Sequence, residues 1–483
     1  MNFYFKMKEN TLKQATYYNA MAKYGTMIIQ IIITMVLARI ILPEEYGVVA
    51  VLTVMLGFFY LIADMGLGIS IIQHPEMDKK NQKQLFSFSI FVGFFISIVV
   101  SLLSYPLSSI YNNDVYFVLC PIISSAAFFN SANIVPNAML IRDKRFDLIA
   151  IRSLVVNFLT GFFAIILAYA GVGVYALIFQ AVFSSLAVFL WNYYNYPLKL
   201  SKFGVENLKN LLGKYSLYQF IFNILNYFTR NTDNLVIGAK MGDVSLGYYN
   251  KAYTLNLYPN MIFTSVITGV LHPYLRDEKD DYIKLLNKLT SILKMLSICG
   301  VLVMIVCYFA SYEIINIFFG PNWNGAVSSF QMLSLCIWSQ MLLSVAGSVF
   351  LGIERTDQVL KCGIINVVSM VITIAVLVQF NSLGIISLGV SILYNLIFIW
   401  TYYILISQTL KESYVNFMKK FYLDFVAAII FILFTQIFNI GTDNLFLSLF
   451  VKIIICISYF LMYLLLSNQL GIIQKIIRLI IRN

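Results

Sequence analysis

Apolar runs of about 20 residues follow one another almost without interruption from residue 17 to residue 467. A helix needs roughly 20 apolar residues to cross the hydrocarbon core of a bilayer. Of the 483 residues, 60% are hydrophobic and 11% are charged, whereas soluble chains carry about 25% charged residues. A soluble core could not bury this much apolar surface, so the sequence predicts an all-α integral membrane protein.

Turn signals divide this apolar sequence into about fourteen predicted transmembrane helices joined by short loops. No loop is long enough to house a separate extramembrane domain, so we predict a protein that is not an enzyme. The predicted spans are residues 17–42, 46–72, 85–105, 115–140, 148–171, 174–195, 216–238, 246–274, 289–311, 325–352, 362–380, 384–409, 421–439 and 445–467.

Lysines and arginines are distributed unevenly between the two sides of the predicted membrane. If the N-terminus is cytoplasmic, 25 of the 33 basic residues fall in cytoplasmic segments and one, Lys240, falls in an outer loop. Basic residues collect in cytoplasmic loops, so this distribution predicts an even number of spans and two cytoplasmic termini. It also accounts for the net charge of +11 without a nucleic-acid partner. The basic tail, residues 471–483, is predicted to form an amphipathic helix on the phospholipid bilayer.

The sequence contains an internal repeat. A shift of 200 residues places the first predicted helix on the seventh and Tyr46-Gly47 on Leu246-Gly247. We therefore predict two six-helix lobes, residues 1–200 and 201–415, related by a pseudo-two-fold axis along the membrane normal. Residues 416–483 would add two extra transmembrane helices and the tail. The shift also aligns two polar stripes, each on one helix face: Asn19, Lys23, Thr26, Gln30 and Thr34, and Gln219, Asn223, Asn226, Arg230 and Asn234.

Both stripes carry a basic residue inside a predicted span, where an uncompensated charge is expensive. Guanidinium and ammonium groups inside a bilayer suit a phosphate, because both form charge-assisted hydrogen bonds with its oxygens. We therefore predict a water-accessible basic cavity between the two lobes. Its predicted substrate-binding residues are Lys23, Gln30, Asn223, Asn226 and Arg230.

Two acidic residues also lie within predicted spans. Asp64 is at a depth that allows pairing with Lys23, and Asp233 is placed to pair with Lys251. Each pair has two interpretations: a permanent ion pair between helices, or a carboxyl group that changes protonation and couples transport to an ion gradient. Pro259 falls in the middle of its span and is predicted as a hinge, with a static kink as the alternative.

Four further charges lie near the ends of predicted spans. We expect each charged group to reach the nearest membrane surface, because that surface is close and most of these side chains are long. Three are near the inner surface and the fourth is near the outer one: Arg152, Lys294, Asp424 and Lys452.

The sequence predicts no metal or cofactor site. His74 and His272 are far apart, and the six cysteines are scattered through apolar segments without a CxxC pair. There is no GxxxxGK[ST] sequence, so we expect no bound nucleotide.

Five short motifs, in order along the chain, resemble the polysaccharide-transport family of bacterial flippases (Wzx-type). This family is part of the multidrug/oligosaccharidyl-lipid/polysaccharide superfamily. The similarity covers roughly residues 10–420 and is closest to the colanic-acid and teichuronic-acid exporters. The motifs are Leu42-Pro-Glu-Glu-Tyr-Gly47, Leu140-Ile-Arg-Asp-Lys-Arg-Phe146, Arg230-Asn-Thr-Asp-Asn-Leu-Val-Ile-Gly238, Leu246-Gly-Tyr-Tyr-Asn-Lys-Ala-Tyr253 and Phe319-Gly-Pro-Asn-Trp323.

The resemblance implies two six-helix lobes that work by alternating access. The implied cargo is an oligosaccharide repeat unit linked to polyprenyl diphosphate. It would move from the inner to the outer leaflet of the bacterial cytoplasmic membrane, for surface polysaccharide biosynthesis. Other membrane proteins of polysaccharide assembly are implied as partners.

Other cargoes remain open on the same fold. A cation-coupled multidrug exporter would favour acidic and aromatic cavity residues, whereas Lys23 and Arg230 favour an anionic cargo. A flippase for a lipid-linked peptidoglycan precursor shares the diphosphate chemistry, and the sequence does not separate the two cargoes. A membrane glycosyltransferase or polymerase is disfavoured, because the chain lacks large outer loops to present to a substrate.

Overall fold

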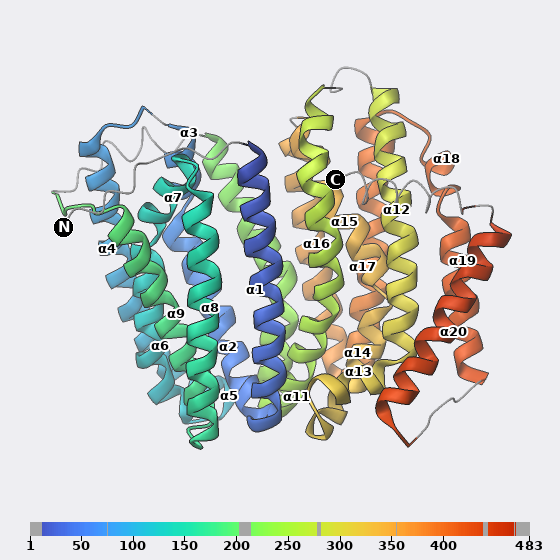
Figure 1. Cartoon of the computed structure of the whole chain (residues 1–483), viewed down its shortest axis with the longest axis horizontal. Coiled ribbons are helices and arrows are strands. Elements are labelled where there is room, and N and C mark those ends of the chain that lie inside the picture. The colour runs from blue at the N-terminus through green and yellow to red at the C-terminus, as the bar shows by residue number, and fades with distance from the viewer. Residues whose placement is uncertain are drawn as a thin grey trace. The chain divides into compact units, whose positions relative to one another are not determined.

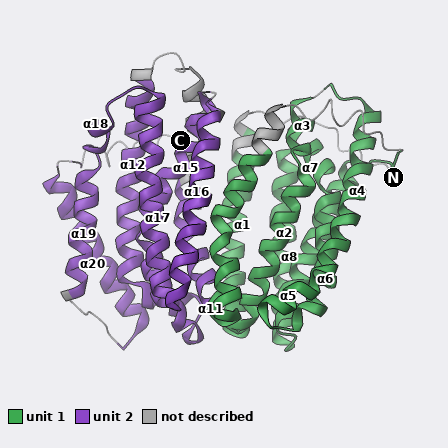
Figure 2. Ribbon diagram, turned by 180° about the vertical axis from the view of Figure 1, so that it is seen from behind, with its two compact units in different colours: residues 1–247 green, residues 248–483 purple. Residues whose placement is uncertain are grey.

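The computed structural model describes residues 12–74, 76–201, 214–277, 282–353, 355–437, 443–467 and 469. Regular secondary structure in these segments is helical, without a strand, so the predicted all-α class is confirmed. The chain divides into two compact units, Met1–Gly247 and Tyr248–Asn483 (Figure 2). The predicted lobe boundary at residue 200 stays a prediction, and the predicted amphipathic tail, residues 471–483, lies outside the described residues.

Unit 1 consists of long helices that run the height of the unit, with short helices at their ends (Figure 1). Its last helix, α11, continues into unit 2. The helices are α1 (Leu12–Ile40), α2 (Pro43–Asp64), α3 (Leu67–Gln73), α4 (Lys79–Leu102), α5 (Ser104–Tyr111), α6 (Val115–Ala132), α7 (Ile134–Arg142), α8 (Phe146–Tyr169), α9 (Val174–Asn195) and α11 (Lys214–Asp277).

Unit 2 begins inside α11 and is also built from upright long helices (Figure 1). Its further helices are α12 (Tyr282–Phe309), α13 (Ser311–Phe318), η1 (Pro321–Ala326), α14 (Val327–Ser334), α15 (Ile337–Gly352), α16 (Thr356–Leu377), η2 (Val378–Phe380), α17 (Leu383–Tyr403), η3 (Ile404–Thr409), α18 (Tyr414–Met418), α19 (Tyr422–Ile437) and α20 (Leu445–Leu466).

Helical segments occupy all fourteen predicted spans in the described chain. Ten helices are long and apolar enough to cross a membrane, and an eleventh span is the pair Pro321–Ser334 and Ile337–Phe350, bent by 57°. The other three positions hold the two arms of α11, before and after Gly242, and the shorter apolar helix Tyr422–Gln436. The chain is therefore a multi-pass helical membrane protein.

The span predicted as residues 46–72 is interrupted near its inner end. Met65 (φ 42°) and Gly66 (φ 83°) are both left-handed, so α2 ends at Asp64 and α3 begins at Leu67. The Oδ1 atom of Asp64 accepts a hydrogen bond of 3.1 Å from the backbone N–H of Gly68. This bond satisfies one of the donors that the first turn of a helix leaves open. An uninterrupted helix was the wrong prediction, because the apolar pattern continues across the break.

Small residues allow close helix contacts in unit 1. A side chain at Gly25 of α1 would collide with Leu154 of α8, and one at Gly161 of α8 would collide with Ile33 of α1. A Cβ at Gly93 of α4 would lie 2.9 Å from the Cβ of Ser131 on α6. Lipid is as apolar as the helix surfaces, so the hydrophobic effect does not drive helices together inside a bilayer. Close packing of this kind is what holds them together instead.

Arg152 of α8 is buried among asparagine side chains rather than extended to the membrane surface. Its Nη1 atom donates to Oδ1 of Asn137, at 2.9 Å, and to Oδ1 of Asn192, at 2.7 Å. Asn192 in turn donates to Oδ1 of Asn133, at 2.7 Å. The expected snorkelling of Arg152 is therefore wrong, because amide oxygens from α9 and from the start of α7 take the place of water.

A buried charge network fastens α19 to two other helices of unit 2. The carboxylate of Asp424 is fully buried. It accepts a hydrogen bond of 2.6 Å from Nζ of Lys294 on α12, and further bonds from the hydroxyls of Ser297 and Tyr463. Lys294 also donates to the backbone carbonyl of Lys420, at 2.8 Å. The snorkelling predicted for Lys294 and Asp424 is wrong, because each neutralises the other inside the helix bundle.

A second network fastens α20. Nζ of Lys452 lies 2.7 Å from Oε1 of Glu313 on α13, and Ser448 donates to the same oxygen at 2.6 Å. The ammonium also lies 5.1 Å from the ring centre of Phe309. Lys452 is 9% exposed and Glu313 is 3% exposed. The predicted route of Lys452 to the outer surface is therefore wrong, because a buried carboxylate binds it first.

Candidate functional site

Helix α1 has two exposed faces of opposite chemistry. Ile28 and Ile32 expose 57% and 55% of their surface. Lys23 and Gln30 are exposed as well, and the helical spacing places them on the side away from these isoleucines. The isoleucine face suits lipid, whereas the lysine and glutamine face suits water or a polar ligand.

The first arm of α11 packs against α2 within unit 1. The Tyr227 hydroxyl donates to the backbone carbonyl of Val54, and the Phe228 ring lies 5.5 Å from the Phe58 ring. Gly57 permits this approach, because a side chain there would collide with Tyr227. These contacts fix which face of the arm is covered by α2.

Arg230 lies one turn after Tyr227 and is exposed. Within the described residues its guanidinium forms neither a hydrogen bond nor an ion pair. Asn223 and Asn226 lie on the same helix face and are half-buried. The structure thus keeps Asn223, Asn226 and Arg230 together on α11, and Lys23 and Gln30 together on α1, all in unit 1. Their role in binding stays a prediction.

The structure does not bring Lys23 and Asp64 together as an ion pair. Lys23 is exposed and has no ion pair among the residues that the structure describes. Asp64 is half-buried at the end of α2, where Gly68 donates to it. The break after Asp64 supplies a backbone partner that a continuous helix would lack. A coupling role for Asp64 stays a prediction.

Asp233 and Lys251 are both buried, one in each unit. Asp233 is 0% exposed, and its Oδ1 atom accepts a hydrogen bond of 2.8 Å from the backbone N–H of Asn234. Lys251 is 7% exposed, and its Nζ atom lies 5.8 Å from the ring centre of Phe319. The pairing of Asp233 with Lys251, and a coupling role for either, stay predictions.

Pro259 lies in the second arm of α11. The interior departure from helical backbone in α11 falls at Gly242 (φ 82°, ψ 173°), where the two arms meet. A positive φ of this size suits glycine, which has no Cβ. The hinge role of Pro259 stays a prediction.

The residues gathered around Asp243, next to this kink, were not predicted from the sequence. Nδ2 of Asn113 donates to one carboxylate oxygen at 2.8 Å, and the hydroxyl of the fully buried Tyr116 donates to the other at 3.3 Å. Burial raises the pKa of the Asp243 carboxyl, while these two hydrogen bonds act in the opposite direction. The available signal was an acid in a very short outer turn, but its partners lie more than a hundred residues earlier.

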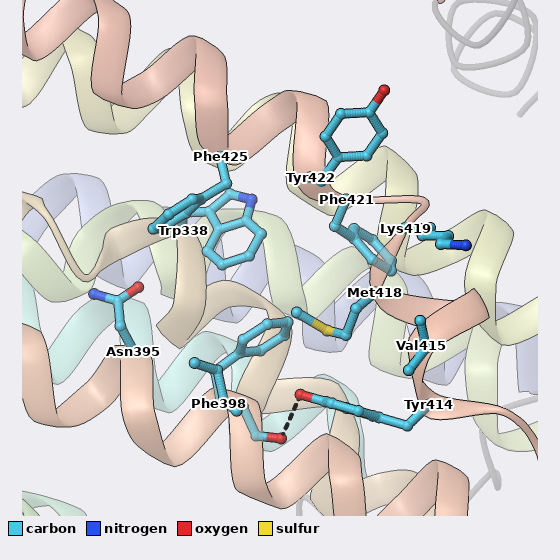
Figure 3. Close-up of a pocket in the computed structure, with 11 residues that line it drawn as sticks. Trp338, Asn395, Phe398, Tyr414, Val415, Met418, Lys419, Phe421, Tyr422 and Phe425 are labelled. Carbon is cyan, nitrogen blue, oxygen red and sulfur yellow. Dashed lines mark hydrogen bonds between the residues drawn. The ribbon is translucent and has the colours of Figure 1, made fainter.

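Unit 2 contains an apolar pocket of about 410 Å³ beside α18 and α19 (Figure 3). Trp338, Phe398 and Phe425 are among its lining residues. The Tyr414 hydroxyl, which also faces it, is already bonded to the backbone carbonyl of Ile399, at 2.8 Å. A sugar or phosphate group loses its water only if several polar partners replace it. This lining suits an apolar chain, so the polar faces of α1 and α11 are the better candidates for a polar headgroup.

The fold and these faces define a multi-pass membrane protein in which two helices expose polar and basic side chains at membrane depth. The profile of a family described as "Polysaccharide biosynthesis protein" matches residues 36–328. The match covers more than half of the chain, and the chain belongs to this family. The resemblance indicated by the five motifs is thereby confirmed.

Individual relatives agree with this assignment. An uncharacterized membrane protein in the cps region of Klebsiella pneumoniae is 24% identical over 458 residues, which is 93% of each chain. The lipopolysaccharide biosynthesis protein WzxC of Escherichia coli (strain K12) is 24% identical over 402 residues, covering 81% of this chain and 80% of WzxC. The solved structure of the lipid II flippase MurJ in an inward closed conformation matches with a TM-score of 0.74 and 15% identity. It covers 93% of this chain and 99% of MurJ, and shows that the two share a fold.

Proposed function

We propose that this chain is a flippase for an oligosaccharide repeat unit linked to polyprenyl diphosphate. It would move this lipid by alternating access from the inner to the outer leaflet of a bacterial cytoplasmic membrane, for surface polysaccharide biosynthesis. Membership of the polysaccharide biosynthesis family supports the pathway, and the fold shared with a lipid II flippase supports the reaction. No bond is made or broken in this transfer, so the chain acts as a transporter and not as an enzyme.

The physical problem that the protein solves is desolvation of the headgroup. Hydroxyls and phosphates lose their hydrogen bonds to water when they enter about 30 Å of hydrocarbon. A path lined by polar side chains replaces those bonds, while the lipid tail stays in the bilayer. The exposed polar face of α1, which carries Lys23 and Gln30, is suited to form part of this path.

The observation that carries the proposal is the state of Arg230. It is a cation on a membrane helix, it is exposed, and the described residues give it no partner. Such a charge is expensive at membrane depth unless water or an anion reaches it. A guanidinium binds two phosphate oxygens at once, whereas an ammonium acts as a point charge. Arg230 therefore suits the diphosphate, with Lys23 assisting.

Substitution of Arg230 tests this assignment. In cells that depend on this chain for export, Arg230→Lys should impair appearance of the polysaccharide, and Arg230→Ala should impair it more. Lipid-linked oligosaccharide should accumulate in the inner leaflet in both cases. Arg355→Ala is the matched control, because its Nη2 atom forms an exposed pair with Asp357, at 3.0 Å. Exposed pairs of this kind contribute at most about 1 kcal/mol to stability.

Protein abundance in the membrane separates binding from folding. A structural role for Arg230 predicts that Arg230→Ala is poorly expressed, whereas the binding role predicts a well-expressed protein that does not export. Normal export by a well-expressed Arg230→Ala variant would refute the role of Arg230. Deletion of the gene tests the cargo: accumulation of a peptidoglycan precursor instead of the oligosaccharide lipid would identify a different flippase.

The same proposal includes topology and partners. We propose that both termini are cytoplasmic, which the distribution of lysine and arginine supports. The enzymes that make the lipid-linked unit inside, and those that polymerise it outside, are the expected neighbours in the membrane. A cation-coupled drug exporter has no comparable support, because Lys23 and Arg230 would repel a cationic drug.

A further inference from the structure

We propose that the outer ends of α2 and of the second arm of α11 form a symmetric glycine crossing that closes the transport path to the outside, latched by Asp243. The inference rests on the proposed flippase function, because a gate requires a transport path. The contacts from which it is argued all lie within unit 1. The outer side is the one given by the predicted topology.

The first observation is a reciprocal close contact between two backbones. A Cβ at Gly47 of α2 would overlap the backbone carbonyl oxygen of Asp243, and a Cβ at Gly247 would overlap the backbone carbonyl oxygen of Pro43. Both glycines are buried. Backbones approach this closely only where glycine is present on each side, so the crossing requires both residues.

The second observation is that this contact obeys the internal repeat. A shift of 200 residues converts Gly47 into Gly247 and Pro43 into Asp243. The contact of Gly47 with Asp243 therefore becomes the contact of Gly247 with Pro43, which is the other half of the same crossing. A two-fold axis requires this reciprocity of any contact that lies on it. The crossing thus marks the pseudo-two-fold axis, where two repeat-related helices meet.

The third observation is that the two halves of the crossing differ at one pair of equivalent positions, 43 and 243. Position 43 is a proline, but position 243 is an aspartate whose carboxylate is held by Asn113, at 2.8 Å, and Tyr116, at 3.3 Å. Nearby, the hydroxyl of Tyr111 donates to the backbone carbonyl of Leu235, at 3.3 Å. These bonds tie α11 to α5, to α6 and to the turn between them. They hold the crossing shut until the carboxylate is released.

The fourth observation is that the two sides of the crossing are held differently. Gly242, directly before Asp243, has a left-handed backbone (φ 82°) and separates the two arms of α11. Glu45, next to the crossing on α2, is fixed on two sides. It accepts hydrogen bonds from the backbone N–H groups of Leu42, at 3.0 Å, and Val174, at 2.7 Å. The α2 side is therefore anchored to α9, and the α11 side is the one that can turn once the bonds to Asp243 are broken.

Thiol labelling from outside tests the gate without reference to the cargo. Asn234→Cys is placed on the buried outer part of the first arm, where 3% of the residue is exposed, in a background without the six native cysteines. Gly47→Ala and Gly247→Ala should each raise its labelling rate by a membrane-impermeant maleimide about tenfold, and by similar amounts, because the added Cβ overlaps a backbone oxygen and disfavours the closed state. Gly347→Ala is the matched control, because a Cβ there meets no atom within 4 Å.

Removal of the latch should have the same effect. Asp243→Ala should raise the labelling rate about tenfold, the change expected from loss of a hydrogen bond to a charged group. In a separate variant, Asn113→Cys with Asp243→Cys should be joined by oxidation to a disulfide. This cross-link should abolish both the outside labelling of Asn234→Cys and transport, and reduction should restore both.

The outcomes separate the gate from the proposed function. Equal labelling in Gly47→Ala, Gly247→Ala and the control, or full transport by the cross-linked protein, would overturn the gate. An effect at one glycine alone would overturn its symmetry. The labelling could follow the predicted pattern in a protein that exports no lipid-linked oligosaccharide. That result would support the gate and contradict the proposed flippase function.

Discussion

The ion pair between Lys294 and Asp424 should contribute more to stability than any exposed pair in the chain. Asp424 is 0% exposed and accepts bonds from three donors, of which Lys294 is the charged one, at 2.6 Å. Lys294→Met keeps most of the aliphatic volume but leaves a buried carboxylate with two hydroxyl donors. Removal of one partner from a buried pair costs about 3–5 kcal/mol in free energy of unfolding.

Thermal unfolding of the purified protein in detergent measures this effect. For a unit of 150–250 residues, each kcal/mol shifts the melting temperature by roughly 2–4 °C, so Lys294→Met should lower it by about 6–20 °C. Lys361→Met is the control, because that lysine is exposed and its Nζ atom bonds only to Gln408, at 3.3 Å, among the contacts described for it. Its substitution should change the melting temperature by no more than about 2 °C, as expected of an exposed contact.

The double variant Lys294→Met, Asp424→Leu distinguishes a buried charge from lost packing. Removing both charges eliminates the unpaired carboxylate, so the double variant should be more stable than Lys294→Met alone. A wild-type melting temperature for Lys294→Met would refute the reasoning. A double variant that loses the sum of the two single effects would do the same.

Three further predictions concern topology, coupling and packing. Cysteines placed in residues 42–46 should react with an impermeant reagent from outside, and cysteines in residues 79–83 should not; the reverse would invert the topology. If Asp64→Asn and Asp233→Asn both retain transport and its dependence on the membrane gradient, neither carboxyl couples transport. Gly161→Leu should reduce the stability by about 1–3 kcal/mol through overpacking against Ile33; unchanged abundance and melting temperature would contradict the close α1–α8 contact.

The helices could be predicted from the sequence because each needs only a run of apolar residues. The breaks within them could not be placed as well. Residues 46–72 read as one helix, yet two left-handed residues, Met65 and Gly66, divide it. Likewise, the bent pair Pro321–Ser334 and Ile337–Phe350 reads as one apolar run. Local backbone conformation is set by neighbouring helices in the bundle, and a hydropathy pattern contains no information about it.

The charged residues show the same limit. Depth in a helix was readable from sequence, but the partner was not, because partners lie far apart along the chain. Asp424 meets Lys294 and Lys452 meets Glu313, more than a hundred residues away in each case. For each charge taken alone, we expected a side chain that extends to the membrane surface. In the structure, these charges form ion pairs with each other instead. Arg152 differs only in that its partners are amide oxygens.

The family motifs acquire physical roles in the structure. The turn from Leu42 to Gly47 supplies Glu45, which caps α2 and binds the start of α9, and Gly47, which permits the backbone crossing. In the segment from Phe319 to Trp323, both aromatic rings are buried and lie 5.6 Å apart. These residues organise turns and helix contacts, so a motif match identifies the fold more directly than it identifies the cargo.

The charges at membrane depth fall into two groups, and the difference separates structure from function. Asp424, Glu313 and Lys452 are buried and Lys294 is half-buried. All four are paired, which stabilises helix contacts and leaves no charge for a ligand. Lys23 and Arg230 are exposed and, among the described residues, have no ion pair. A bilayer penalises an unpaired charge, so a helix that exposes one needs a source of compensation outside the protein fold. A diphosphate that enters and leaves supplies that compensation in each cycle, which is why these two residues, rather than the buried pairs, are the ones to test for transport.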